Sequence, residues 1–135
     1  MNVPEMPRGA NVVGVGIDQI EVSRIRDSID RHGEAFLSKV FSKWEQEECM
    51  QRVDPAPCLA ARFAAKEAVS KALGTGIGKN FGWLDMEVKK GKNGQPIASF
   101  SEHGSLALLE RQASSALISL THLNEIASAV VVLIR

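Results

Sequence analysis

The stretch RFAAKEAVSKALGTGIG, residues 62–78, determines how the rest of the sequence is interpreted. Alanine recurs at positions 60, 61, 64, 65, 68 and 72, a pattern that favours a helix and lets neighbouring elements approach closely. Asp54 and Pro55 predict the start of this helix, with Asp54 as the N-cap and Pro55 as the first helical residue. Gly74 predicts its end. We therefore expect one long helix packed on a sheet.

The other segments have either strand or helix spacing. NVVGVGID is apolar and β-branched, with glycines where another backbone can come close, so it predicts a buried strand that ends at Asp18. Ser42 and Glu45 have capping-box spacing and predict the start of a helix. The elements expected outside the long helix are a strand at 11–18, helices at 19–33, 34–41 and 42–52, a hairpin at 83–100, a helix at 103–113, and strands at 115–122 and 126–134.

This order of elements predicts an α+β fold. Hairpins replace the regular alternation of strand and helix that a parallel sheet requires, so we expect a largely antiparallel sheet with the long helix packed on it. A chain of 135 residues, 44% of them hydrophobic, fits one domain with a single core. We assign that domain to residues 11–135 and expect residues 1–10 to be a flexible N-terminal arm.

The composition argues against several classes of function. The 16 basic and 16 acidic side chains cancel, so we expect no nucleic-acid partner. No segment approaches the roughly 20 apolar residues of a membrane span, so we expect no membrane association and a cytoplasmic location. Cys49 and Cys58 match no paired zinc spacing, and we interpret both as reduced thiols. A zinc site that combines them with His103 or His122 is disfavoured.

Three charged residues have a structural interpretation beside a functional one. Glu67 and Lys71 are four apart on the predicted helix, in the order that favours a surface ion pair. Asp18 precedes Glu21 by three residues, which is the spacing of an N-cap. Taken alone, each structural interpretation is favoured. Neither explains the loop GTGIG, where glycines and Thr75 offer a backbone against which a bulky anion can lie.

The phosphate-binding motifs in common use do not account for this loop. GTGIG follows a helix instead of opening one after a strand, so it is neither a Walker loop nor a dinucleotide fingerprint. Arg62, Lys66 and Ser70 are expected on rows that adjoin Glu67 and Lys71 on the same side of the helix. The anion site would therefore combine this helix face with the glycine loop.

Five blocks carry a family resemblance: GVGIDQIEVSRI (14–25), FLSKVFSKWE (36–45), RFAAKEAVSKALGTGIG (62–78), LDMEV (84–88) and SLTH (119–122). In this order they resemble the holo-acyl-carrier-protein synthase family of small 4′-phosphopantetheinyl transferases. The resemblance implies the family's fold and a magnesium-dependent reaction. In that reaction the 4′-phosphopantetheine arm of coenzyme A passes to a serine of apo acyl carrier protein, for fatty acid biosynthesis, and adenosine 3′,5′-bisphosphate is released.

The resemblance also implies roles for individual residues. Asp18 and Glu67 match the two magnesium-ligand carboxylates, and Lys71 matches the lysine that reaches the reacting phosphate. These three are the expected catalytic residues. Arg24 matches the arginine that meets the acidic carrier protein. The residues expected to bind the substrate around its nucleotide and phosphates are Arg62, Ser70, Gly74, Thr75, Gly76 and His122.

Elementary chemistry agrees with this assignment. Magnesium prefers oxygen ligands and is commonly held by one or two carboxylates, with phosphates and water completing its shell. Phosphoryl transfer needs in-line positioning and charge stabilisation, which the ion and Lys71 would supply. Two acceptors for the serine proton stay open, a metal-bound water and Glu67.

Family members assemble as homotrimers with active sites between subunits, so the resemblance implies a homotrimer here. The alternative hypothesis is a catalytically silent, nucleotide-binding trimeric module on the same scaffold. The carrier-binding patch and the adenine-side contacts are the parts expected to differ, because the sequence departs from the family pattern at Ala35, Lys39, Ala61, Leu123 and Ile126.

Overall fold

The computed structural model describes residues 8, 9 and 11–135. Most of the arm expected at 1–10 therefore lies outside the described residues. Within the described part, no helix combines the length and the apolar composition needed to cross a bilayer. The elements are β1 (Val12–Glu21), α1 (Val22–His32), α2 (Glu34–Val40), α3 (Lys43–Met50), α4 (Ala56–Leu73), β2 (Met86–Lys90), β3 (Pro96–Phe100), α5 (Glu102–Glu110), β4 (Ser115–His122) and β5 (Ile126–Ile134).

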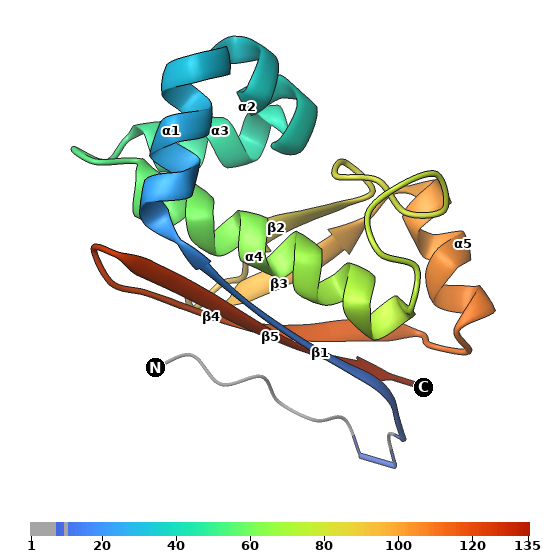
Figure 1. Cartoon of the computed structure of the whole chain (residues 1–135). Helices are drawn as coiled ribbons and strands as arrows, with labels where there is room; N and C mark the ends of the chain where they lie inside the picture. The colour runs from blue at the N-terminus through green and yellow to red at the C-terminus, as the bar shows by residue number, and fades with distance from the viewer. Residues whose placement is uncertain (1–7, 10) are drawn as a thin grey trace.

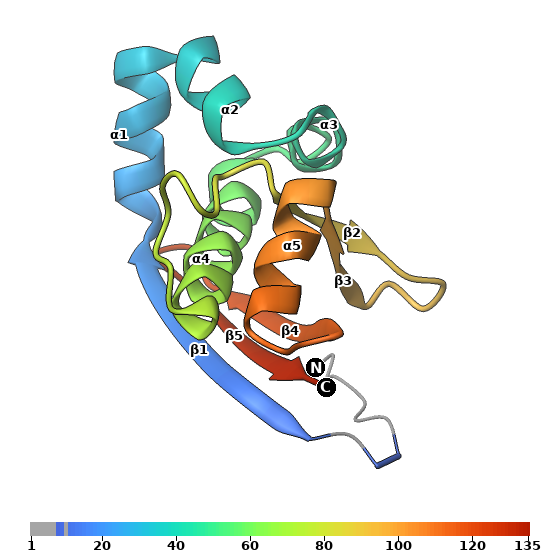
Figure 2. The same ribbon diagram turned by 90° about the vertical axis from the view of Figure 1, so that its right-hand side faces the viewer.

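The strands form two antiparallel sheets. One has three strands in the order β1-β5-β4, and the other is the β2-β3 hairpin. Figure 1 shows α4 lying across one face of the three-stranded sheet, with α1, α2 and α3 gathered at one end of α4. Figure 2 shows β1 along one flank of α4 and α5 with the hairpin on the other. The predicted α+β fold with antiparallel strands is confirmed.

The small side chains of α4 bring it unusually close to β1. The alanines at 60, 61, 64, 65, 68 and 72 are at most 2% exposed. A Cβ atom added at Gly16 would lie 2.0 Å from the carbonyl oxygen of Ala68, and one at Gly14 would lie 2.8 Å from that of Ala72. The expectation that glycines in the first strand admit another backbone is therefore correct.

β1 is longer than predicted. It continues through Asp18 to Glu21, because its antiparallel pairing with β5 extends to Ile126. Helix α1 begins at Val22, and its N-cap Glu21 makes no side-chain capping bond. The prediction that the strand ends at Asp18 is wrong, and so is the interpretation of Asp18 as an N-cap. The predicted stop at Gly33 is confirmed.

The start of α4 also differs by one residue from the prediction. Pro55 is the N-cap, and the first helical residue is Ala56. Asp54 is not the N-cap, but its Oδ1 accepts a hydrogen bond of 3.3 Å from the Ala56 N–H. This bond reaches the residue two positions on, a common spacing for an aspartate that precedes a helix. Gly74 ends the helix as predicted, in the left-handed conformation.

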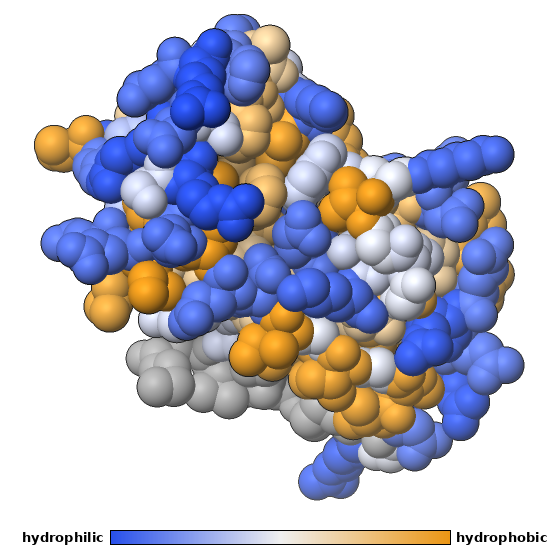
Figure 3. Space-filling model, viewed as in Figure 1, coloured by the Kyte–Doolittle hydropathy of each residue, from blue (hydrophilic) through white to orange (hydrophobic). Residues whose placement is uncertain are grey.

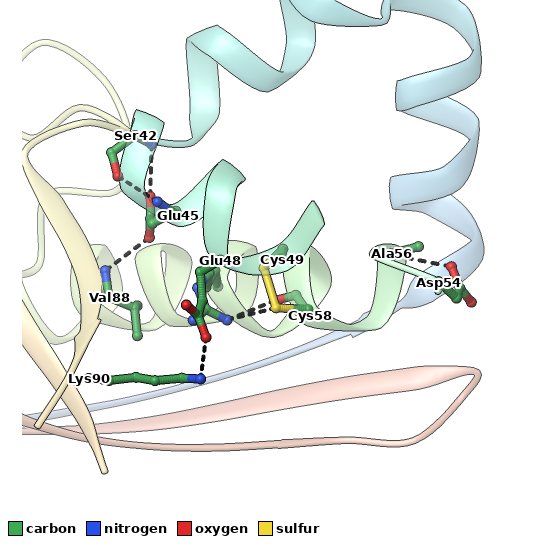
Figure 4. Close-up of a disulfide and its surroundings, with 10 residues drawn as sticks. Ser42, Glu45, Glu48, Cys49, Asp54, Ala56, Cys58, Val88 and Lys90 are labelled. Carbon is green, nitrogen blue, oxygen red and sulfur yellow. Dashed lines mark hydrogen bonds and ion pairs between the residues drawn. A yellow bond between two sulfur atoms is a disulfide. The ribbon is translucent and has the colours of Figure 1, made fainter. Parts of the chain in front are cut away.

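The two cysteines are bonded to each other. Cys49 lies in the last turn of α3 and Cys58 in the first turn of α4, with their Cα atoms 5.5 Å apart (Figure 4). The interpretation of both as reduced thiols is therefore wrong. The turn between the two helices folds the chain back on itself, and a separation of nine residues does not reveal that proximity.

A buried ion pair joins α3, α4 and β2. Lys66 Nζ lies 2.9 Å from Glu45 Oε1, and both side chains are fully buried. Lys66 also donates to the carbonyl oxygens of Trp83, at 2.8 Å, and Met86, at 2.6 Å. Glu45 accepts the Val88 N–H at 2.9 Å and closes the predicted capping box of α3 (Figure 4). These hydrogen bonds offset the cost of burying both charges.

Replacing Lys66 with methionine should lower the free energy of unfolding by about 3–5 kcal/mol, because Glu45 would be left as an unpaired buried charge. Urea denaturation measures this change. Lys71→Met is the matched control on the same helix. The Lys71 side chain is 53% exposed, so its removal should cost less than about 1 kcal/mol. Equal losses in the two variants would contradict the role assigned to the buried pair.

Gly16→Ala should destabilise the protein by about 1–3 kcal/mol or more, because the added methyl group forces β1 away from α4. Chemical denaturation gives the value. Gly78→Ala is the control, since a Cβ there meets no described atom within 4 Å. That variant should stay within about 0.5 kcal/mol of the parent. An unaffected Gly16→Ala protein would refute the close backbone contact.

Candidate functional site

One group of predicted site residues meets where the middle of β1 faces the C-terminal half of α4. Asp18 lies on the α4-facing side of β1, in line with the buried residues Gly16 and Ile20. Lys71 Nζ is 2.8 Å from Asp18 Oδ1 and 3.3 Å from the carbonyl oxygen of Ile17. The structure thus joins two of the three expected catalytic residues, which are far apart in the sequence.

Glu67 precedes Lys71 by about one turn on the same face of α4. Burial raises the pKa of the Glu67 carboxyl, the negative charge of Asp18 raises it further, and Lys71 opposes the rise. The second cause means that the Asp18 and Glu67 carboxylates lie close enough for their negative charges to repel each other. The surface ion pair between Glu67 and Lys71 that the spacing favours is replaced here, because Lys71 pairs with Asp18.

The chemistry of this group fits a magnesium ion. Asp18 and Glu67 offer carboxylate oxygens, and a cation between them would relieve the repulsion that raises the pKa of Glu67. Within residues 8, 9 and 11–135, this site included, no three His, Cys, Asp or Glu side chains converge on a metal site. Any further ligands would have to come from the substrate and from water, and the metal role of the two carboxylates stays a prediction.

Arg62, Lys66 and Ser70 are more deeply buried than this group. They form a separate row of α4 and are 5%, 0% and 0% exposed, respectively. Arg62 and Lys71 are nine residues apart, which places them about 180° apart around a helix of 3.6 residues per turn. The expectation that all these residues lie on one side of the helix is wrong for Arg62, which is buried on the side opposite Lys71.

His122 lies within range of the charge of Arg62 and is separated from Asp18 by a strand. It lies at the end of β4, and β5 separates β4 from β1. Burial lowers the pKa of His122, and the positive charges of Arg52 and Arg62 lower it further. We call Arg52, Arg62 and His122 the basic group. Sequence reasoning missed Arg52, since nothing in the spacing of the α3–α4 turn indicates which way that loop folds.

The glycines of GTGIG shape the end of α4. Gly74 and Gly76 have φ values of 79° and 65°. The N–H groups of Thr75 and Gly76 donate to the carbonyl oxygen of Ser70, at 3.1 and 3.2 Å. The Ser70 hydroxyl donates to the carbonyl oxygen of Glu67 at 2.7 Å. Helix termination thus accounts for the positive φ angles, and the contact of this loop with a substrate stays a prediction.

Arg24 lies on α1, beside a hollow of about 710 Å³ between this helix and the β4–β5 turn. The hollow is also lined by Ser23, Arg26 and Glu125, and Arg26 is paired with Asp54. Figure 3 shows hydrophilic side chains over this end of the molecule and hydrophobic ones gathered along β1. Arg24 is therefore accessible to a charged partner.

The sequence of the chain matches a known protein family and its curated members. The family described as the 4′-phosphopantetheinyl transferase superfamily matches residues 14–131. A holo-[acyl-carrier-protein] synthase of Chlamydia muridarum is 48% identical over 119 residues, which cover 88% of this chain and 92% of that protein.

Two solved structures have the same fold. The crystal structure of the holo-[acyl-carrier-protein] synthase of Neisseria meningitidis gives a TM-score of 0.84 at 30% identity, covering 91% of this chain and 98% of that one. The crystal structure of the Helicobacter pylori holo-[acyl-carrier-protein] synthase in complex with coenzyme A gives a TM-score of 0.79 at 33% identity. The match covers 88% of this chain and 98% of that one. The resemblance inferred from the five sequence blocks is confirmed. The chain belongs to the 4′-phosphopantetheinyl transferase superfamily, among its holo-[acyl-carrier-protein] synthases.

Proposed function

We propose that this protein transfers the 4′-phosphopantetheine arm of coenzyme A to a serine of apo acyl carrier protein, releasing adenosine 3′,5′-bisphosphate, with Mg²⁺ as cofactor. The observation that carries the proposal is the group formed by Asp18, Glu67 and Lys71 between β1 and α4. The coenzyme A bound to the H. pylori relative and the activity by which the relatives are named support the substrate and the partner.

Lys71 can stabilise charge on the substrate. Asp18 and the carbonyl oxygen of Ile17 hold its ammonium group, yet the side chain remains 53% exposed. The displacement increases negative charge on phosphate oxygens, and a fixed ammonium group lowers the energy of that arrangement. Magnesium held by Asp18 and Glu67 would, when bound, neutralise the pyrophosphate of coenzyme A. The serine proton would pass to Glu67 or to a metal-bound water, the two acceptors that stay open.

We propose further that the protein is a homotrimer whose active sites lie between subunits. Asp18, Glu67 and Lys71 occupy one flank of α4, and Arg62 with His122 occupies the other. One chain therefore directs its two groups of site residues away from each other. In a cyclic assembly, the first group of one subunit can face the basic group of the next, so that both meet one coenzyme A molecule.

The outer face of the three-stranded sheet supports an assembly. Val15 and Ile17 are 61% and 67% exposed, and they stand opposite Val132 and Val130 of β5. None of the described helices or strands covers this face of the sheet (Figures 1 and 2). A contiguous apolar surface of this kind marks a contact with another protein surface.

Two further assignments belong to this proposal. Arg24 would meet acidic side chains of the carrier protein, since an exposed cation complements a negatively charged partner. The cytoplasmic location stays a prediction, and the disulfide does not support it, since disulfides are rare in cytosolic proteins.

Glu67→Gln should reduce transfer by about 100-fold or more while leaving fold and assembly intact, because it removes a charge with little change of volume. Mass spectrometry of apo acyl carrier protein, incubated with coenzyme A and the enzyme, detects the added arm. The gain should require magnesium and disappear with a chelator. Glu110→Gln, on the exposed end of α5, is the control and should be as active as the parent. A folded parent that binds coenzyme A but modifies no carrier would favour the silent module.

Shared active sites predict complementation between inactive variants. Glu67→Gln and His122→Glu disable different groups, so subunits of both kinds, mixed by dissociation and reassembly, should regain up to about a quarter of the parent activity. A mixture of Glu67→Gln with Asp18→Asn should gain nothing, because both changes damage the same group. Sedimentation of the mixtures checks that they assemble. Failure of the first mixture, despite normal assembly, would place each active site within one chain.

A further inference from the structure

The Cys49–Cys58 disulfide contacts Arg62 of the basic group and closes the loop that carries Arg52. Arg62 Nη1 donates to Cys58 Sγ at 3.1 Å and approaches the Cys58 carbonyl oxygen at 3.4 Å. The backbone N–H of Arg52 donates to the Cys49 carbonyl oxygen at 3.1 Å. Figure 4 shows the disulfide bridging the end of α3 and the start of α4. The disulfide therefore contacts one arginine directly and restrains the backbone of the other by closing the loop.

Arg62 is a buried cation whose guanidinium is not fully hydrogen-bonded within the described residues. It is only 5% exposed, and its Nε has no hydrogen-bond partner among the described residues. Burial lowers the pKa of the guanidinium and the nearby Arg52 lowers it further, while the negative charges of Glu45 and Glu48 oppose the shift. Buried polar groups normally have partners, so this side chain is suited to receive an anion from outside the chain.

We propose that Cys49 and Cys58 form a thiol–disulfide switch that sets how tightly the basic group binds a phosphate of coenzyme A. This inference rests on the proposed function for the identity of the ligand. In the disulfide form, residues 50–57 are a closed loop, which holds Arg52 in place relative to Arg62. The oxidised protein is therefore the form with the higher affinity.

Reduction releases the loop. A dithiol reductant supplies two electrons and two protons, the S–S bond breaks, and the products are two cysteine thiols and the disulfide of the reductant. Without the cross-link the loop gains conformational freedom, so Arg52 must be ordered again when the ligand binds. This ordering cost weakens binding of a phosphate.

The location of the disulfide allows this change without unfolding. Cys49 and Cys58 are 0% and 1% exposed, but Met50 and Val53 in the loop between them are 45% and 107% exposed. Opening of this surface loop gives a reductant access to the sulfur atoms. The buried pair of Glu45 and Lys66 holds α3 on α4 in either state, so the fold persists.

The test compares the oxidised full-length protein with the same protein reduced by dithiothreitol and desalted without oxygen. Thiol labelling counts free cysteines in each sample, and calorimetry measures the Kd for adenosine 3′,5′-bisphosphate. Reduction should raise this Kd by about three- to tenfold, the cost of ordering one long side chain. The KM for coenzyme A should rise alike while kcat changes little, because Asp18, Glu67 and Lys71 lie on the other flank of α4.

Two variants isolate the cause. The double variant Cys49→Ser with Cys58→Ser should bind like the reduced protein and ignore the reductant. Arg52→Ala should keep the disulfide but lose the response, whereas the control Arg111→Ala, at the end of α5, should keep both.

The outcomes separate this inference from the proposed function. Normal transfer with equal Kd values in both redox states, or a pair of thiols that no disulfide oxidant closes, would overturn the switch alone. Absence of transfer and of nucleotide binding in both states would overturn the proposed function and the switch together. A Kd that rises on reduction in the parent, but not in Arg52→Ala, establishes the switch.

Discussion

The close contact between β1 and α4 sets the geometry of the whole molecule. Because Gly16 has no side chain, the strand comes to rest against the carbonyl oxygen of Ala68, and no other residue type fits that position. This separation brings Asp18 on the strand within hydrogen-bond distance of Lys71 on the helix. The same alanine-rich surface lets α4 pack closely on the sheet. Because that face of the helix is covered, the functional side chains project from its two flanks.

On each flank, charge is treated differently. Asp18, Glu67 and Lys71 are partly accessible. Burial and the charge of Asp18 raise the pKa of Glu67, and Lys71 opposes that rise. Lys66, between the flanks, is sealed from water and satisfied by Glu45 and two backbone carbonyl groups. Arg62 is sealed as well but lacks a full set of partners. The long helix thus carries one accessible cation paired with Asp18, one buried cation with a full set of partners and one buried cation with an unpaired Nε.

Much of the fold follows from local patterns. The strand at NVVGVGID, the capping box of Ser42 and Glu45 and the helix end at Gly74 depend on residues close in sequence, and the structure has all three. β1 runs past Asp18 because β5, more than 100 residues later, pairs with it. The disulfide likewise depends on how two helices pack. The spacing of residues along the sequence does not reveal such tertiary contacts.

The candidate site divides in the same way. Glu67 and Lys71 share a helix face by their spacing alone, whereas their relation to Asp18 came from the family resemblance and acquires a distance only in the fold. The direction of Arg62 could not be predicted, since a helix dominated by alanine has no clear polar face from which to orient it. Arg52 was missed because a loop residue is positioned by the packing around it.

The hydrogen bonds of Lys66 also bear on how the protein unfolds. The β2-β3 hairpin belongs to a separate sheet and shares no backbone ladder with β1, β5 and β4. Yet Lys66 binds the carbonyl oxygens of Trp83 and Met86 at the start of that hairpin. If the hairpin detached, the Lys66 ammonium group would lose these two hydrogen-bond acceptors while still buried. The two sheets are therefore coupled into one cooperative unit, although no strand connects them.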